Sequence, residues 1–420
     1  MYSRFGRIPI RCPFAIASLL VVAAAGAAAA QQSEGAEDGD LPQFRVDGQF
    51  RLRFEADGRT ADVDPDFAVL SRVRVGGGVV LADWIDVYAR IQDSRAWGDE
   101  LNTLTDASAD QLDLNEGYVV LGSGPGFKAR LGRQQVKIAD ERLVGAVDWT
   151  NTGRSLDGAR LSGKAGRFDW SAFWMSIRER DSLLSVGLDP QLNQGVNDDG
   201  WLIGGFGSTS LGSLIAELTF LVDRYAITEE SYTTNLRVHG NSSGFLYEGA
   251  GAWQTGPDLS AWFASGRLGY GWGRNSIAAQ LDYLSGDPDP DDGETKAFNT
   301  LYATNHKFYG FMDYFLALPA QLDQAGLVDA VLRGAWGAAP NTTVRLDLHR
   351  FWTAEERNGE TALGTELDLM GAWSILPQAN LAGGIGLFMP DQLITELLPA
   401  FAGGDDTTWW GFVQLTLMWP

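Results

Sequence analysis

The chain has 420 residues, with 54 acidic and 32 basic side chains and a formal net charge of −22 at pH 7. This excess of negative charge excludes a protein that binds nucleic acid chiefly through its phosphates. With 45% hydrophobic and 11% aromatic residues, the composition also excludes a disordered chain. A single cysteine excludes a disulfide framework and a cysteine-ligated metal site.

The first 30 residues have the pattern of a secretory signal peptide. Arg4, Arg7 and Arg11 precede an apolar, alanine-rich run over residues 14–30, which ends in three alanines suited to cleavage. A transmembrane anchor is the alternative, but the run is shorter than the roughly 20 residues that a spanning helix needs. We therefore expect a signal peptide at 1–30 and a short periplasmic segment at 31–43. Cys12 would leave with the signal peptide, so the mature chain would contain no cysteine.

From Phe44 onwards, apolar and polar residues alternate with a period of two. Between Phe44 and Glu55 every even position is apolar or small and every odd position is polar. The same alternation runs through 69–81 and 84–92, and later through 344–349 and 365–373, where Glu366 and Asp368 fall on the polar face. Since successive side chains of a strand point to opposite faces, these segments predict strands with one apolar and one polar side.

The connections between these segments are of two kinds. Short, turn-rich connections occur at 122–126, 165–167, 210–213 and 338–341, and long polar connections at 96–110, 179–199, 287–304 and 403–408. Strict alternation of short and long connections is typical of transmembrane β-barrels. We therefore predict an all-β fold, a single transmembrane antiparallel β-barrel over 44–420, with 18 strands within a range of about 16–18.

A secreted β-sandwich, propeller or solenoid would also show alternation. Three features favour the membrane: tryptophans near strand ends, charges on the polar face, and the absence of a repeat of fixed period. The last predicted strand, 409–419, ends in aromatic residues, as is common for outer-membrane barrels, although Pro420 is the final residue.

Several stretches resemble the alginate export family of Gram-negative outer-membrane barrels. They are 131–137, 140–145, 149–154 and 156–161, then 247–254 with 269–270, then 285–287, 291–293, 295–298 and 304–315. The last of these, TNHKFYGFMDYF, is the most specific because strand alternation does not explain it. The resemblance runs from about residue 44 to the end. It implies an 18-stranded barrel in the outer membrane that passes a polysaccharide or another elongated solute.

Arginines are concentrated in the first part of the chain. Residues 31–180 hold 19 of the 29 basic residues that follow residue 30. An arginine on the lipid face costs about 2–4 kcal/mol at mid-bilayer, so those in strands should face the lumen. The candidates for a lumen pathway on strands are Arg45, Arg51, Arg53, Arg72, Arg74, Arg90, Arg130 and Arg133. The segment between strands, which could fold inward, adds Arg142, Arg154 and Arg160.

Two interpretations of these arginines remain open. They could form a net cationic lane that attracts an anion. Alternatively, they could form a structural network with acidic residues of neighbouring strands, for which the available partners are Asp47, Glu55, Asp86, Asp93, Asp113 and Glu116.

Other candidate sites carry weaker patterns. Asp287, Asp289 and Asp291 resemble part of a calcium loop, but Asp292 and Phe298 stand where such a loop needs glycine and glutamate. Ser242 lies in a G-x-S-x-G motif, which in hydrolases joins a strand to a helix but here joins two alternating segments. None of the three histidines, His239, His306 and His349, is spaced as a metal pair, and we expect His306 to serve packing or hydrogen bonding.

The sequence therefore predicts a passive channel in the Gram-negative outer membrane that exports an anionic polysaccharide or oligosaccharide through an arginine-rich lumen. A substrate-selective uptake porin for small anions or sugars is the alternative, and an outer-membrane enzyme or an adhesive barrel are rivals of other classes. We expect no enzymatic activity and no cofactor. The expected partners are outer-membrane lipid, the anionic polysaccharide or small anionic solute, and periplasmic export proteins, but no nucleic acid.

Overall fold

The computed structural model describes residues 42–60, 64–97, 111–122, 124, 126–178, 200–227, 230–398 and 406–420. The predicted signal peptide and nearly all of the predicted periplasmic segment lie outside these residues. So do most of the long connections predicted at 96–110, 179–199 and 403–408.

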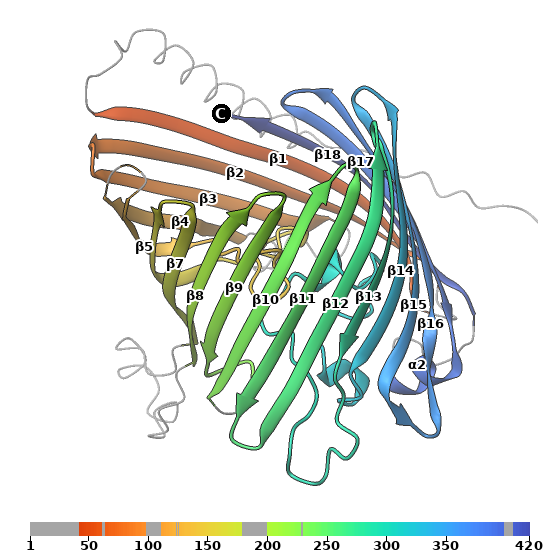
Figure 1. The fold of residues 1–420 in the computed structure, drawn as a ribbon. Coiled ribbons are helices and arrows are strands. Elements are labelled where there is room, and N and C mark those ends of the chain that lie inside the picture. Colours follow the sequence, from red (N-terminus) through yellow and green to blue (C-terminus); the bar gives the residue numbers. More distant parts are fainter. Residues whose placement is uncertain are drawn as a thin grey trace, which may run out of the picture.

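The chain forms one 18-stranded antiparallel sheet that closes into a barrel by pairing β1 with β18 (Figure 1). The strands are β1 (Gln43–Gly58), β2 (Asp66–Ala82), β3 (Ile85–Trp97), β4 (Gln111–Leu121), β5 (Lys128–Gln134), β6 (Leu156–Ala165), β7 (Phe168–Arg178), β8 (Gly200–Leu211), β9 (Leu214–Asp223), β10 (Ser231–Ser242), β11 (Phe245–Gly256), β12 (Leu259–Trp272), β13 (Asn275–Leu284), β14 (Leu327–Ala339), β15 (Thr342–Arg357), β16 (Glu360–Leu376), β17 (Ala379–Pro390) and β18 (Thr408–Trp419). Among the residues that the structure describes, three short helical turns accompany them: η1 (Asn305–Lys307), η2 (Ala320–Leu322) and α2 (Gln392–Leu397). The predicted all-β barrel and its strand number are confirmed.

Alternation decides which side chains face outward. On β1, Phe44 and Phe54 are 76% and 52% exposed, whereas Arg51 and Arg53 are buried. On β16, Glu366 and Asp368 are buried as well, on the polar face predicted for them. The outer surface is therefore apolar and the inner surface polar, the reverse of a water-soluble sheet protein.

Aromatic side chains mark the two edges of the outer apolar surface. On β12, Trp262 and Trp272 are both exposed, and Leu268 is the most exposed residue between them. Ten residues of a strand tilted by about 40° span roughly 25 Å, which is the height of the apolar band of such barrels. Within the described residues, no helix combines the length and apolarity needed to cross a bilayer.

The connections differ between the two ends of the barrel. The predicted short connections join β4 to β5, β6 to β7, β8 to β9 and β14 to β15. All four lie at the rim of the barrel where β1 begins and β18 ends. At the other end the strict alternation of short and long connections fails twice, since β11–β12 and β15–β16 are tight hairpins. Asn358 and Gly359 adopt positive φ angles of 56° and 82°, the conformation that an Asn-Gly hairpin turn requires.

Two long connections fold into the barrel instead of covering its mouth. We call residues 135–155, between β5 and β6, the first inserted segment, and residues 285–326, between β13 and β14, the second inserted segment (Figure 1). Val144 of the first and Tyr309, Met312 and Phe315 of the second are buried in one apolar cluster with residues of the barrel wall. The barrel is therefore filled by its own chain over part of its length.

Candidate functional site

Four of the predicted lumen arginines lie side by side on the inner face of β1 and β2. Arg51, Arg53, Arg72 and Arg74 are only 3%, 3%, 1% and 4% exposed, and Arg51 stands directly opposite Arg72. We call these four residues the arginine wall. Four guanidinium groups this close repel one another, so they require a matching set of acceptors.

The acceptors come from the backbone of the first inserted segment. Arg51 donates to the carbonyl oxygens of Asp148 and Thr150 at 2.9 and 2.8 Å, and Arg53 donates to that of Trp149 at 2.8 Å. Arg72 reaches the same two carbonyls as Arg51, each at 3.2 Å. The wall is thus occupied by a row of oxygen atoms from the chain itself.

One carboxylate completes this contact. Asp148 Oδ1 lies 2.7 Å from Arg74 Nη1 and 3.2 Å from Arg72 Nη1. Burial by itself would raise the pKa of Asp148, but the charges of Arg72 and Arg74 outweigh it and hold that pKa below its ordinary value. Asp148 is therefore ionised at neutral pH and provides a negative charge from the inserted segment, in addition to that of Glu55 on β1, which lies 2.6 Å from Arg53.

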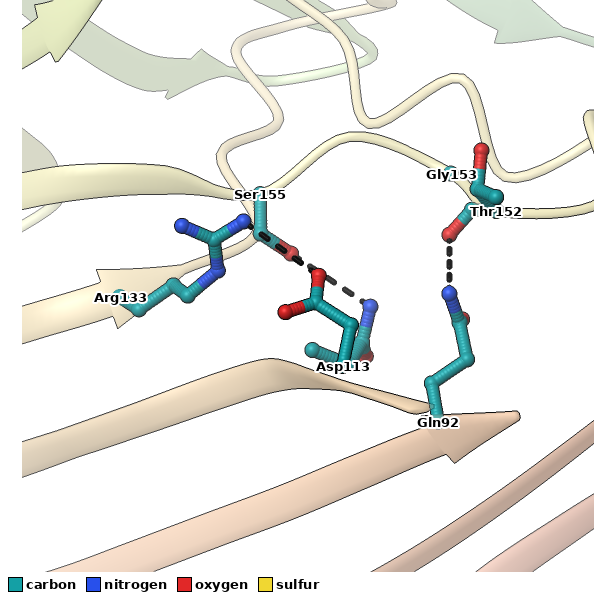
Figure 2. A pocket seen from close by; sticks show the side chains of 7 residues that line it. Gln92, Asp113, Arg133, Thr152, Gly153 and Ser155 are labelled. Carbon is teal, nitrogen blue, oxygen red and sulfur yellow. Dashed lines mark hydrogen bonds and ion pairs between the residues drawn. The ribbon is translucent and has the colours of Figure 1, made fainter. Parts of the chain in front are cut away.

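Polar side chains of β2 and β3 extend the contact along the segment. Gln92 donates to the carbonyl of Thr152 at 2.9 Å, as Figure 2 shows, and Ser94 donates to that of Asn151 at 2.9 Å. The Asn151 amide in turn donates to the carbonyls of Ser71 and Arg95. Residues 148–152 therefore bind β1–β3 through polar groups, while the Trp149 ring also packs edge-on against Trp410 and Phe412 of β18.

The second inserted segment is held by the opposite type of surface. Met312 N donates to Glu366 at 2.9 Å, and Phe311 N donates to Asp368 at 3.3 Å. These acids belong to a group on β13–β16 that is at most 1% exposed: Asp282, Asp329, Asp347, Glu366 and Asp368. The lumen thus has a basic side that binds carbonyl oxygens and an acidic side that binds amide hydrogens.

The two inserted segments also bind each other. Val144 and Tyr302 form a parallel bridge, with Gly145 N donating to Tyr302 O and Tyr302 N to Leu143 O, each at 2.9 Å. Trp149 stacks on His306 at 4.3 Å between ring centroids, and the Arg53 guanidinium lies 4.3 Å from the Trp149 ring. The segments therefore act as one plug across the lumen.

Two of the arginines predicted between strands are parts of this plug. Arg142 bonds to Asp282 at 2.7 Å and to Tyr309 at 3.2 Å, and although burial opposes its charge, Asp282 keeps its pKa above the ordinary value. Arg154 donates to Tyr302 O at 2.5 Å, and burial lowers its pKa. Arg160 is different, because it lies on β6 and not between strands as predicted.

Most of the other predicted lumen arginines form ion pairs with acidic residues. Arg45 pairs with Asp86, and Arg90 with Asp47 and Glu116. Arg133 reaches Asp157 at 2.8 Å and Asp113 at 3.6 Å beside a cavity of about 70 Å³ (Figure 2). Glu55 and Asp93 pair with Arg53 and Arg95, so all six acidic residues predicted as partners do have an arginine.

The weaker candidate sites have local structural explanations. Asp287 is buried and accepts the backbone N–H groups of Asp289 and Lys296, each at 3.1 Å, and no cluster of three metal-ligating side chains occurs among the described residues. Ser242 ends β10 at a hairpin turn into β11, so the strand-to-helix elbow of a hydrolase is not formed there. His306 hydrogen bonds to Asp313 at 2.6 Å.

The sequence matches a known protein family. The alginate export family matches residues 43–187 and 219–395, most of the chain and both inserted segments. The chain belongs to the alginate export family. It is accordingly a Gram-negative outer-membrane β-barrel of a channel-forming family, as the sequence predicted. No curated protein matches the sequence.

Solved structures with the same barrel are outer-membrane porins of the Occ type. Pseudomonas aeruginosa OccK8 (OprE) superposes with a TM-score of 0.62 at 11% identity, covering 90% of this chain and 98% of that one. Acinetobacter baumannii OccAB4 gives 0.62 at 10% identity, with 91% and 100% covered. At such identities the likeness concerns the fold of this alginate export family member.

Sequence reasoning missed the residues that fill the arginine wall. Trp149 begins a stretch that resembled the family, 149–154, and Asp148 immediately precedes it, yet no acceptor role was predicted for either residue. The available signal was the break in strand alternation over 135–155, which marks a segment with contacts other than those of a strand.

Proposed function

We propose that this member of the alginate export family is a passive channel that carries an anionic polysaccharide or oligosaccharide outward along the basic side of its lumen. One observation carries the proposal: the arginine wall binds a continuous row of oxygen atoms. A chain of uronate sugars offers the same chemistry, because its carboxylates and hydroxyls present oxygen acceptors at regular intervals.

The plug determines what opening requires. The arginine wall is occupied by residues 148–152, and the Asp148 carboxylate stands where a uronate carboxylate would bind Arg72 and Arg74. A polyanion that replaces these acceptors supplies the buried guanidinium groups with partners while the segment leaves. Opening by exchange therefore avoids leaving Arg51, Arg72 and Arg74 without the acceptors that the segment supplies, which would cost several kcal/mol.

Planar-bilayer recording of the purified barrel tests this function. We expect polyuronate to block the ion current through the channel at low voltage, and we expect this block to be relieved at higher voltage. A neutral polymer of the same length should leave the current unchanged. Block by small carboxylic acids but not by polyuronate would instead support a small-anion uptake porin. A channel indifferent to both would contradict the proposal.

The same preparation tests the rival of another class. Ser242 lies in a turn between two strands, without the helix that a nucleophile elbow needs. We expect the purified protein to show no hydrolysis of lipid or ester substrates, and a hydrolysis that Ser242→Ala abolishes would revive the enzyme.

A further inference from the structure

Three cations at the periplasmic end of the barrel lack the acidic partners that Arg45, Arg90 and Arg133 have. Lys128 and Arg130 lie on β5 and Arg160 on β6, with Arg130 directly opposite Arg160. Side chains in that relation have Cβ atoms roughly 5 Å apart, and like charges there destabilise the sheet. In the part of the chain that the structure describes, no carboxylate pairs with any of the three.

The contacts that these cations do make leave binding capacity free. The Arg130 guanidinium lies over the Tyr118 ring at 4.3 Å, and Arg160 donates to Ser171 Oγ at 3.3 Å. Arg160 Nε is buried without an acceptor. In a chain with 54 acidic and 32 basic residues, three adjacent cations without carboxylates indicate a ligand and not a missing partner.

An open cleft adjoins two of the three cations. It has a volume of about 340 Å³, within the range of about 300–1,000 Å³ found for ligand sites. Its walls are formed by β5–β8 and include Lys128, Arg160, Ser162, Asp169, Ser171 and Phe206. The cleft therefore combines cations, hydroxyl groups, one carboxylate and an aromatic ring.

We propose that this cleft binds a sugar acid at the periplasmic entrance of the channel, an inference that rests on the proposed function and adds a location to it. Arg160 and Lys128 bind the carboxylate, Ser162 and Ser171 bind ring hydroxyls, and Phe206 packs against the apolar face of the ring. Asp169, held 3.2 Å from Lys164, accepts a hydroxyl hydrogen. A phosphate would gain nothing from Asp169, whose charge repels it.

The position of the cleft gives it a distinct role. The arginine wall is occupied by the plug, whereas Lys128, Arg130 and Arg160 stand near the short β4–β5 and β6–β7 turns. In outer-membrane barrels these short turns face the periplasm. A solute arriving from the periplasm therefore meets these free cations before it reaches the plug.

Calorimetric titration of the full-length barrel in detergent tests the cleft. The probes are trigalacturonate, maltotriose (a neutral sugar of the same length) and inorganic phosphate. We expect the wild type to bind trigalacturonate, and Arg160→Gln and Lys128→Gln each to weaken this binding at least about tenfold. Arg160→Lys should recover part of the loss. Arg274→Gln, which removes an exposed charge from the β12–β13 turn, is the matched control and should bind as the wild type does.

Several outcomes would contradict the proposal that the cleft binds a sugar acid. Unchanged affinity in both glutamine variants, no binding by the wild type, or binding of maltotriose or phosphate as tight as that of trigalacturonate would each do so. Should Arg160→Gln fail to migrate as a folded barrel in gels, Lys128→Gln still decides. If polyuronate blocks the wild-type channel but neither variant changes the affinity for trigalacturonate, the cleft is rejected and the export function stands. If polyuronate does not block the wild-type channel, the export function itself is rejected.

Discussion

At the scale of single residues, the arginine wall shows how a membrane barrel keeps charge inside. Arg51 and Arg72 are directly opposite like charges, an arrangement that is unfavourable unless acceptors are close. The neutral acceptors are backbone carbonyls of the first inserted segment and the side-chain amides of Gln49 and Gln92. Two carboxylates, Glu55 and Asp148, face the four guanidinium groups, so the wall keeps part of its positive charge, and Asp148 is the carboxylate that the inserted segment supplies.

Replacing Asp148 by asparagine tests this balance. Asp148→Asn keeps the shape of the side chain but removes the charge that Arg72 and Arg74 share, so we expect residues 148–152 to leave the wall more often. Conductance without substrate should rise severalfold in bilayer recordings. Asp113→Asn, which removes a carboxylate 3.6 Å from Arg133, is the matched control and should behave as the wild type.

The same residue predicts a pH dependence. Because the folded pKa of Asp148 is below its unfolded value, its contribution is complete above about pH 4 and is lost as the pH falls through the lower folded pKa. The wild-type channel should therefore open more often only below about pH 4. Asp148→Asn should show no such rise, and an identical acid response in both proteins would contradict the assignment.

The sign of the wall itself can be reversed. Arg72→Glu with Arg74→Glu places two carboxylates beside Asp148, so the first inserted segment should be expelled and the selectivity should shift toward cations. The reversal potential in a salt gradient measures this shift. Arg224→Glu with Arg274→Glu changes the same charge at exposed positions and is the control. An unchanged reversal potential in the wall variant would mean that ions do not pass this face.

At the scale of elements, each strand has two faces with different solvents. On β12, Leu268 is 71% exposed and lies between Trp262 and Trp272, at mid-height of the apolar band. Gly271 is on the opposite, lumen-facing side of the same strand, and a Cβ there would meet nothing closer than 3.6 Å.

Two arginine substitutions on this strand separate lipid from lumen. Leu268→Arg should lower the free energy of unfolding in lipid vesicles by about 2–4 kcal/mol, because a charge at mid-bilayer is poorly solvated. Gly271→Arg adds the same side chain on the wet face and should cost far less. Equal costs, measured by denaturant titration of vesicle-refolded protein, would show that the outward face has been assigned to the wrong residues.

The inserted segments are the elements that alternation could not describe. In residues 135–155 the period-two pattern stops, which predicts a connection but not its direction. The stretches at 140–145 and 304–315, which resemble the alginate export family, both lie in the plug. Their partners are about 150 residues apart in sequence, so no local pattern could indicate that they meet.

At the scale of the whole molecule, the lumen is divided by charge. The arginine wall and the unpaired cations of β5–β6 occupy one side, and the five buried acids of β13–β16 the other. Each side binds the inserted segment whose exposed backbone groups complement it. The net charge of −22 for the chain therefore does not describe the inner face of β1 and β2, which is basic.

The sequence by itself determined the barrel, a range of about 16–18 strands, the outward face and the inward direction of the arginines, because alternation between neighbouring residues sets the side of the sheet on which each side chain lies. It left open whether those arginines were free or bound. Only the tertiary structure decided that question, since the acceptors on Asp148, Trp149 and Thr150 lie almost 100 residues from Arg51 and Arg53. Closure of the barrel brings such distant groups together, and the pairing of a charge with a backbone carbonyl leaves no trace in composition or periodicity.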